Sequence, residues 1–345
     1  MKRRWTALAL GLALTGSAAA HADSPGADSH GADPYGADPR GSLTVVLPEG
    51  LSPRTVGYYM AQDKGYFDSA GLHVTFSASG DAAPSAVLVK GQADLAVELM
   101  PVALGRRQDG DDIVHIAQIF RKAGMELVCR ATVDRPASLK NHVVGVYFGG
   151  LESAFYAWMS ALSLNPFGGP GSVTVLRQNF GLEAFQRSQA DCATSFTYRA
   201  PLDFAAAGLK LQDMKLYRYD EAGVATLEDG LYARGADLAR PERVAQFAAF
   251  LAAVTKGWRF AHNNPKAAFD LIHADPAFAN ADTAALRQAI DAVDDLVAPD
   301  SGPIGKLDRN AYNQTVNLLL TAAPDPVLTK APAGAVSDVV WKAMK

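Results

Sequence analysis

The feature that most constrains this chain is the alternation of short apolar runs with helical patterns that end at a glycine. The first example joins an apolar run at 43–50 to a helical pattern that begins at Ser52-Pro53 and ends at Gly65, and then to an alternating segment at 72–77. Proline suits the first turn of a helix and glycine suits its left-handed end, whereas strict alternation favours a half-buried strand. The pattern predicts a strand, a helix, a short aromatic turn and a second strand, which together form a parallel βαβ unit.

The alternation occurs in two series, with Pro136 between them. Strands are predicted at 95–98, 112–120 and 125–131 before this join, and at 143–148, 172–178 and 192–198 after it. A further strand at 225–234 is expected to return to the first half, and the rest of the chain has mostly helical patterns. A chain of 345 residues is too long for one ordinary core. We therefore predict an α/β fold with two lobes, one formed by residues 42–131 and 226–345 and the other by residues 132–225.

The N-terminus indicates export. Lys2, Arg3 and Arg4 precede an apolar run at 5–14, and small residues then lead to Ala20-His21-Ala22, so residues 1–22 are predicted to be a cleaved signal peptide. The run is about half of the ~20 apolar residues that a membrane span needs. No cysteine follows the cleavage site, so we do not expect a lipoprotein. Residues 23–41 repeat Gly-Ala-Asp with almost no large apolar side chain, which predicts a disordered linker.

Charge and cysteine content narrow the classes of function. Removing the signal peptide leaves 29 basic and 36 acidic residues, a formal net charge of −7. With no cluster of Lys or Arg, this charge argues against a nucleic-acid partner. The sequence offers no pattern of His and Cys typical of a metal site. Cys129 and Cys192 lie in apolar runs, so we expect two buried thiols rather than a disulfide, although an oxidising compartment permits one.

Several stretches carry a family resemblance. They include "MAQDKGYFDSAGLHV" (60–74), "VKGQADLAVEL" (89–99), "VYFGGLESAFYAWMS" (146–160) and "QADCATSFTY" (189–198), and further matches continue to about residue 336. The chain resembles the periplasmic substrate-binding proteins of ABC importers that are related to thiamine pyrimidine synthase and to sulfonate-, taurine- and nitrate-binding proteins. The stretches at 146–160 and 189–198 resemble those of a subgroup whose members are assigned to the uptake of thiamine-precursor pyrimidines or riboflavin.

The resemblance implies a type II periplasmic-binding-protein fold, in which two α/β lobes are joined by two crossover strands and close on a ligand in the cleft. The hinges are then expected near residues 129–136 and 223–230. It also implies a monomer in the periplasm, with no cofactor, that delivers its ligand to a membrane permease and its ATPase. An exported sensor domain of the same fold is the alternative role. Independently, ligands of open α/β sheets bind beyond the carboxyl ends of the strands.

The segments expected at those strand ends are rich in aromatic and acidic residues. The predicted ligand-binding residues are Tyr58, Asp81, Glu98, Phe148, Gly149, Gly150, Glu152, Ser195, Thr197, Tyr198 and Glu228. Aromatic faces stack on planar rings, carboxylates accept hydrogen bonds from amino groups, and paired glycines permit a close approach of the backbone. Only Arg54 and Arg199 are nearby cations. We therefore predict a small planar nitrogen heterocycle as ligand, with a sulfonate, taurine or nitrate-type anion as the alternative.

Some residues near the expected cleft also have a purely structural explanation. Glu98 could be a solvated charge at a strand end, and Glu152 could stabilise the first turn of a helix. Tyr66 and Phe67 are expected to pack in the core, and so is Trp158, while His115 is expected in the interior.

Catalysis is the main rival to binding, because thiamine pyrimidine synthase has this fold. The resemblance places Glu98 and Val102 where that enzyme has its cofactor-holding Lys and its substrate His. Its cysteine-rich iron-binding segment also has no counterpart here. Without these groups the reaction has no nucleophile or donor, so we predict a binding protein rather than an enzyme.

Overall fold

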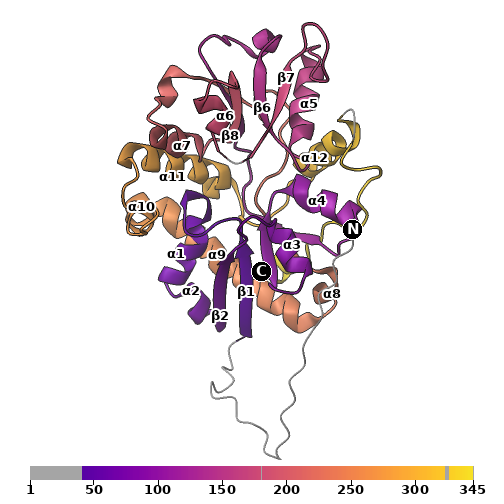
Figure 1. Ribbon diagram of the computed structural model, residues 1–345. Coiled ribbons are helices and arrows are strands. Elements are labelled where there is room, and N and C mark those ends of the chain that lie inside the picture. The colour runs from indigo at the N-terminus through magenta and orange to yellow at the C-terminus, as the bar shows by residue number, and fades with distance from the viewer. Residues whose placement is uncertain (1–40, 180, 323–325, 345) are drawn as a thin grey trace, which may run out of the picture. The chain divides into compact units, whose positions relative to one another are not determined.

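The computed structural model describes residues 41–179, 181–322 and 326–344 (Figure 1). The predicted signal peptide and residues 23–40 of the predicted linker lie outside these residues. Gly41, the last residue of the linker prediction, instead belongs to the first strand. The described strands form two mixed sheets of five strands each, and none of the described helices is long and apolar enough to cross a membrane.

The first sheet has the strand order β2-β1-β3-β10-β4. Its strands are β1 (Gly41–Leu47), β2 (Leu72–Ala78), β3 (Leu95–Glu98), β4 (Val114–Gln118) and β10 (Gly230–Ala233). β1 pairs in parallel with β2 and β3, whereas β10 runs antiparallel to both of its neighbours. The predicted βαβ unit and the predicted return of the chain near residue 230 are therefore confirmed.

The link between β1 and β2 forms as its sequence pattern predicts. It contains η1 (Pro53–Thr55), α1 (Val56–Asp63) and α2 (Tyr66–Ser69). Gly65 separates the two helices with a φ of 66°, a left-handed conformation that favours glycine. Phe67 is buried and stacks on Phe250 of α9 (Pro241–Asn263), while Tyr66 is half-buried against the same core. The aromatic turn therefore packs this unit against α9.

The second sheet has the order β7-β6-β8-β5-β9. Its strands are β5 (Met125–Cys129), β6 (Val143–Tyr147), β7 (Thr174–Gln178), β8 (Cys192–Phe196) and β9 (Lys215–Arg218). The segment 125–131 was predicted correctly as a strand but was assigned to the first lobe. It pairs with β8 and β9, so the predicted boundary after residue 131 falls inside the second sheet. β9 was not predicted.

The two connections between the sheets follow from this topology. One spans residues 119–124 between β4 and β5, and the other spans residues 219–229 between β9 and β10. The hinge expected near 129–136 is therefore wrong, because Pro136 begins η2 (Pro136–Leu139) within the second half of the fold. The second connection overlaps the hinge expected near 223–230.

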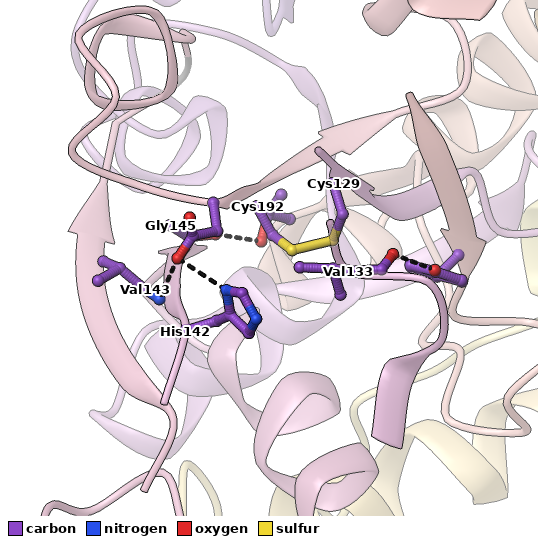
Figure 2. Close-up of a disulfide and its surroundings, with 9 residues drawn as sticks. Cys129, Val133, His142, Val143, Gly145 and Cys192 are labelled. Atoms are coloured by element: carbon purple, nitrogen blue, oxygen red, sulfur yellow. Dashed lines mark hydrogen bonds and ion pairs between the residues drawn. A yellow bond between two sulfur atoms is a disulfide. The ribbon is translucent and has the colours of Figure 1, made fainter. Parts of the chain in front are cut away.

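Cys129 and Cys192 form a disulfide, which corrects the prediction of two thiols (Figure 2). They are register partners on the antiparallel strands β5 and β8, with Cα atoms 4.0 Å apart. Both side chains are buried, as predicted. The pairing depends on two strands that are 63 residues apart in sequence, and no local pattern reveals such a contact.

The remaining helices cover the two sheets (Figure 1). They are α3 (Pro84–Val89), α4 (Met100–Gln108), α5 (Glu152–Ala161), α6 (Glu183–Gln186), α7 (Ala200–Ala206), η3 (Leu211–Asp213), α8 (Gly235–Leu238), α10 (Pro265–His273), α11 (Thr283–Val297), η4 (Pro299–Ser301), α12 (Arg309–Thr321) and α13 (Val339–Ala343). α11 packs on α7, and α12 packs on α5. C-terminal helices therefore contact the helices that flank the second sheet.

Candidate functional site

A cavity of about 750 Å³ lies beyond the carboxyl ends of strands from both sheets. From the first half it is lined by Pro48, Glu49, Arg54, Ser79, Gly80, Asp81, Ala82, Ala83, Pro84, Glu98, Leu99 and Val102. From the second half it is lined by Tyr147, Phe148, Gly149, Leu151, Arg177, Gln178, Asn179 and Arg199. The loops after β1, β2 and β3 thus face those after β6, β7 and β8, in the position where α/β sheets hold ligands.

The structure places four of the predicted residues on this wall, namely Asp81, Glu98, Phe148 and Gly149. The other seven, Tyr58, Gly150, Glu152, Ser195, Thr197, Tyr198 and Glu228, do not line it. Val102, four residues after Glu98 in the sequence, also lines the cavity. The wall contains no Lys, His or Cys side chain among the described residues.

Glu98 is the buried carboxylate of the cavity. Its side chain accepts hydrogen bonds from the Ser85 amide at 3.3 Å, the Ser85 hydroxyl at 3.0 Å and its neighbour Leu99 amide at 2.9 Å. The residue is only 4% exposed, so the alternative of a solvated strand-end charge is wrong. Burial raises the pKa of Glu98, although these hydrogen bonds favour the ionised form and oppose the shift.

The opposite wall combines an aromatic ring with a cation. The Arg177 guanidinium lies 4.5 Å from the centroid of the Phe148 ring. Tyr147 stacks on Phe196 and Phe196 stacks on Tyr198, with centroids 5.8 Å and 5.2 Å apart. Tyr198 therefore lies two rings behind the wall, which explains why it does not reach the cavity.

Arg54, which belongs to η1 of the first half, lines the cavity. Its Nε donates to Asp229 Oδ2 at 2.8 Å and its Nη2 donates to Asp229 Oδ1 at 2.5 Å, so the pair is bidentate. Both side chains are buried. The Arg54 charge is therefore compensated by a residue of the second connection. The guanidinium also lies 5.8 Å from the Tyr198 ring centroid.

Glu228 links the two connections between the sheets through hydrogen bonds. Its Oε1 accepts hydrogen bonds from the amides of Gly124 at 2.7 Å and Met125 at 2.8 Å, which belong to the first connection and to the start of β5. Burial, reinforced by the neighbouring Asp229, raises the pKa of Glu228 to about 8. The Glu228 Oε2 atom and the hydroxyls of Tyr58, Ser195, Thr197 and Tyr198 are buried without a hydrogen-bond partner among the described residues.

Gly150 and Glu152 have structural roles in this conformation. Glu152 is the first residue of α5 and the acidic residue of its first turn, and its carboxylate accepts a hydrogen bond from the Gly150 amide at 2.8 Å. Gly150 has a φ of 107°, and a Cβ atom there would lie 3.2 Å from the Pro101 carbonyl oxygen. This glycine therefore permits a close approach of the backbone to Pro101 of α4.

Sixteen of the twenty lining residues were not among the predicted site residues, and these include Glu49, Tyr147, Arg177, Gln178 and Asn179. The signal for three of them was present, because the strand at 172–178 was predicted and its carboxyl end carries Arg177, Gln178 and Asn179. Arg54 and Arg199 were noted only as nearby cations, and both line the cavity.

The fold is that of the periplasmic binding proteins. A Candida albicans protein described as exhibiting the generic periplasmic binding protein fold superposes with a TM-score of 0.58, at 15% identity over 88% of this chain and 94% of that chain. A putative periplasmic sulfonate-binding protein of an ABC transporter, from Methylobacillus flagellatus KT, gives 0.64 at 12% identity over 88% and 93%. The desulfurization enzyme DSZB gives 0.55 at 16% identity over 88% and 99%.

Within this class, the profile of the family described as NMT1/THI5 like matches residues 52–268. The chain belongs to this family. No curated protein matches it.

Proposed function

We propose that this protein is the extracytoplasmic solute-binding component of an ABC import system, which captures a small solute in the cavity and releases it unchanged. The observation that carries the proposal is the cavity itself. Its volume of about 750 Å³ suits a small molecule, and loops from both sheets contribute to its wall. The proposal includes a periplasmic, monomeric protein with a cleaved signal peptide, and a membrane permease and its ATPase as partners.

The ligand that we propose is a planar nitrogen heterocycle, of the thiamine-precursor pyrimidine or riboflavin type. Phe148 offers a ring on the cavity wall, and Glu98 offers a buried carboxylate that accepts hydrogen bonds from ring or exocyclic amino groups. A sulfonate or related anion is the second candidate. It is favoured by Arg177 and Arg199 on the wall and by the description of the Methylobacillus relative as sulfonate-binding.

Binding without catalysis is supported by the chemistry of the wall. Glu98 and Val102 stand where the resemblance to thiamine pyrimidine synthase requires a Lys and a His. Imine and thiol chemistry need an amine or thiol nucleophile, and none of the described lining residues is a Lys, His or Cys.

The test is a thermal-shift screen of pyrimidines, flavins, taurine, alkanesulfonates and nitrate, followed by calorimetry on each hit. A ligand at ~100 times its dissociation constant should stabilise the protein by about 2.7 kcal/mol. Recovery of the hit by mass spectrometry after overnight incubation checks for conversion. A converted product would establish an enzyme instead, and stabilisation by sulfonates alone would replace the heterocycle with the second candidate. Co-purification with a membrane kinase rather than a permease would favour a sensor.

A further inference from the structure

The charges on the cavity wall are divided between its two sides. The first half contributes Glu49, Asp81 and Glu98, together with Arg54, whose charge Asp229 compensates. Among the described lining residues of the second half, the charged ones are the cations Arg177 and Arg199. Arg199 is paired with Asp203 at 3.3 Å and lies 3.7 Å from Glu49 across the cavity. One side of the cavity is therefore acidic and the other is basic.

Arg177 carries the uncompensated positive charge of this arrangement. Within the described part of the chain it forms no ion pair or hydrogen bond, and its one specific contact is the face of the Phe148 ring at 4.5 Å. A guanidinium that lies over a ring keeps its N–H donors in its own plane. Those donors match a carboxylate, sulfonate or phosphate group in a bidentate geometry.

Asp81 and Glu98 carry the uncompensated negative charge of the opposite side. Asp81 is exposed to the cavity and forms no ion pair with a described residue. Glu98 is 4% exposed, and all three of its hydrogen-bond donors are neutral. The nearby Arg54 charge is already paired with Asp229. A buried carboxylate without an ion-pair partner of its own is costly, and a positively charged or N–H-rich group of a ligand would lower that cost.

We propose that the cavity selects a dipolar solute, whose amino or ring N–H groups face Asp81 and Glu98 while an oxyanion on the same molecule binds Arg177. This inference rests on the proposed function, and it adds that neither a neutral heterocycle nor a simple anion is the preferred ligand. Arg177 is then a specificity-determining residue: it discriminates between solutes that share a ring but differ in the oxyanion.

The experiment compares two matched sets of probes by calorimetry on the mature protein. The ring set is 4-amino-5-hydroxymethyl-2-methylpyrimidine and its phosphate monoester, and the open-chain set is taurine, ethanesulfonate and ethylamine. The dipolar members are the phosphate monoester and taurine. We expect at least one of them to bind roughly tenfold or more tightly than the other probes of its set, because a probe that lacks the oxyanion or the amino group loses a charge-assisted hydrogen bond. Arg177→Gln should lower the affinity for the dipolar probe of a set to that of the probe without an oxyanion, which is the unphosphorylated pyrimidine or ethylamine. The affinity for the probe without an oxyanion should not change.

Arg130→Gln is the matched control. Arg130 also lies over a phenylalanine ring, 4.4 Å from the Phe185 centroid, but it does not line the cavity. This variant should bind every probe as the wild type does. Glu98→Gln should weaken every probe that bears an amino group, and Asp81→Asn supplies the same test at an exposed position should the buried variant fold poorly.

The outcomes separate the two proposals. Binding of the neutral pyrimidine or of ethanesulfonate as tightly as the dipolar member, unaffected by Arg177→Gln, would overturn the dipolar ligand and leave a binding protein. Equal weakening of all probes by Arg177→Gln would also overturn the inference. A dipolar preference in the open-chain set alone would retain the inference and reject the heterocycle. If neither set binds, both the proposed ligand and this inference fail.

Discussion

Glu98 and Glu228 are both buried carboxylates, but they lie in different surroundings. Glu98 lines the cavity and accepts hydrogen bonds from Ser85 and Leu99. Glu228 does not line the cavity and accepts hydrogen bonds from the amides of Gly124 and Met125. Both were predicted from their positions at expected strand ends. Such a position places a residue near the cleft, but it does not say whether the side chain points into the cavity or toward the connections.

Glu228→Gln should change how stability depends on pH. Burial raises the pKa of Glu228 in the folded state to about 8, above its ordinary value of 4.5. The folded state therefore holds the proton more tightly, and the free energy of unfolding falls as pH rises between these two values. Glutamine keeps an acceptor oxygen but does not titrate. The variant should gain about 1–3 kcal/mol relative to the wild type between pH 5 and pH 8.

Urea unfolding of both proteins at several pH values measures this difference. Glu126, whose pKa burial raises to about 7, also titrates in this range, but its contribution is common to both proteins and cancels. Parallel stability curves for the two proteins would contradict a raised pKa at Glu228.

Gly149 and Gly150 provide a second comparison at the scale of single residues. Both have positive φ angles, 85° and 107°, but only at Gly150 would a Cβ atom meet a neighbour, the backbone of Pro101. Gly149→Ala should cost about 1–2 kcal/mol from backbone strain alone. Gly150→Ala should cost about 1 kcal/mol or more beyond that, because Pro101 must move. Chemical denaturation of the two variants measures the costs, and equal values would show that the contact with Pro101 is not tight.

At the scale of elements, the units with local signals were predicted well. β1, α1, α2 and β2 follow one another with a proline at the start of the first helical turn and glycines at their ends. β5 was found as a strand but placed in the wrong half, and β9 was missed. Both belong to antiparallel pairings with strands far away in sequence, and such pairings leave no mark on the local pattern. The disulfide escaped prediction for the same reason.

Loss of the disulfide should weaken the second sheet. The bond closes a loop between residues 63 positions apart, and chain entropy assigns about 4 kcal/mol to a loop of that length. A Cys129→Ala/Cys192→Ala variant should therefore have a lower urea midpoint than the oxidised wild type. Addition of a reductant should lower the wild-type midpoint and leave that of the variant unchanged. A midpoint unaffected in both experiments would show that the pairing of β5 with β8 is secured by its other contacts.

At the scale of the whole molecule, the main hydrophobic core is continuous between the two sheets. One cluster of buried side chains includes Val45 and Leu95 of the first sheet together with Leu127, Val144 and Phe196 of the second. The prediction of two lobes anticipated two sheets but not a shared core. Side-chain contacts across the connections depend on how the halves meet, and no single segment encodes that arrangement.

The shared core predicts that residues 41–345 unfold in one cooperative transition. Trp158 reports on the second half through its contact with Tyr219, and Trp258 reports on the first half through Tyr58 and Phe120. Tryptophan fluorescence and far-ultraviolet circular dichroism should therefore give coincident urea curves. Replacing either buried tryptophan with phenylalanine should lower the midpoint by the same amount in both signals, because the two halves unfold together. Two separated transitions would show that the halves are energetically independent.

The position of β10 between β3 and β4 has a consequence for chains that end early. A chain that ends after Arg218 contains the whole second sheet, because all five of its strands lie within residues 125–218. The first sheet of such a chain retains a gap, with the inner edges of β3 and β4 unpaired, because β10 is missing. Unpaired edges attract other chains, so a fragment cut between residues 219 and 229 should self-associate.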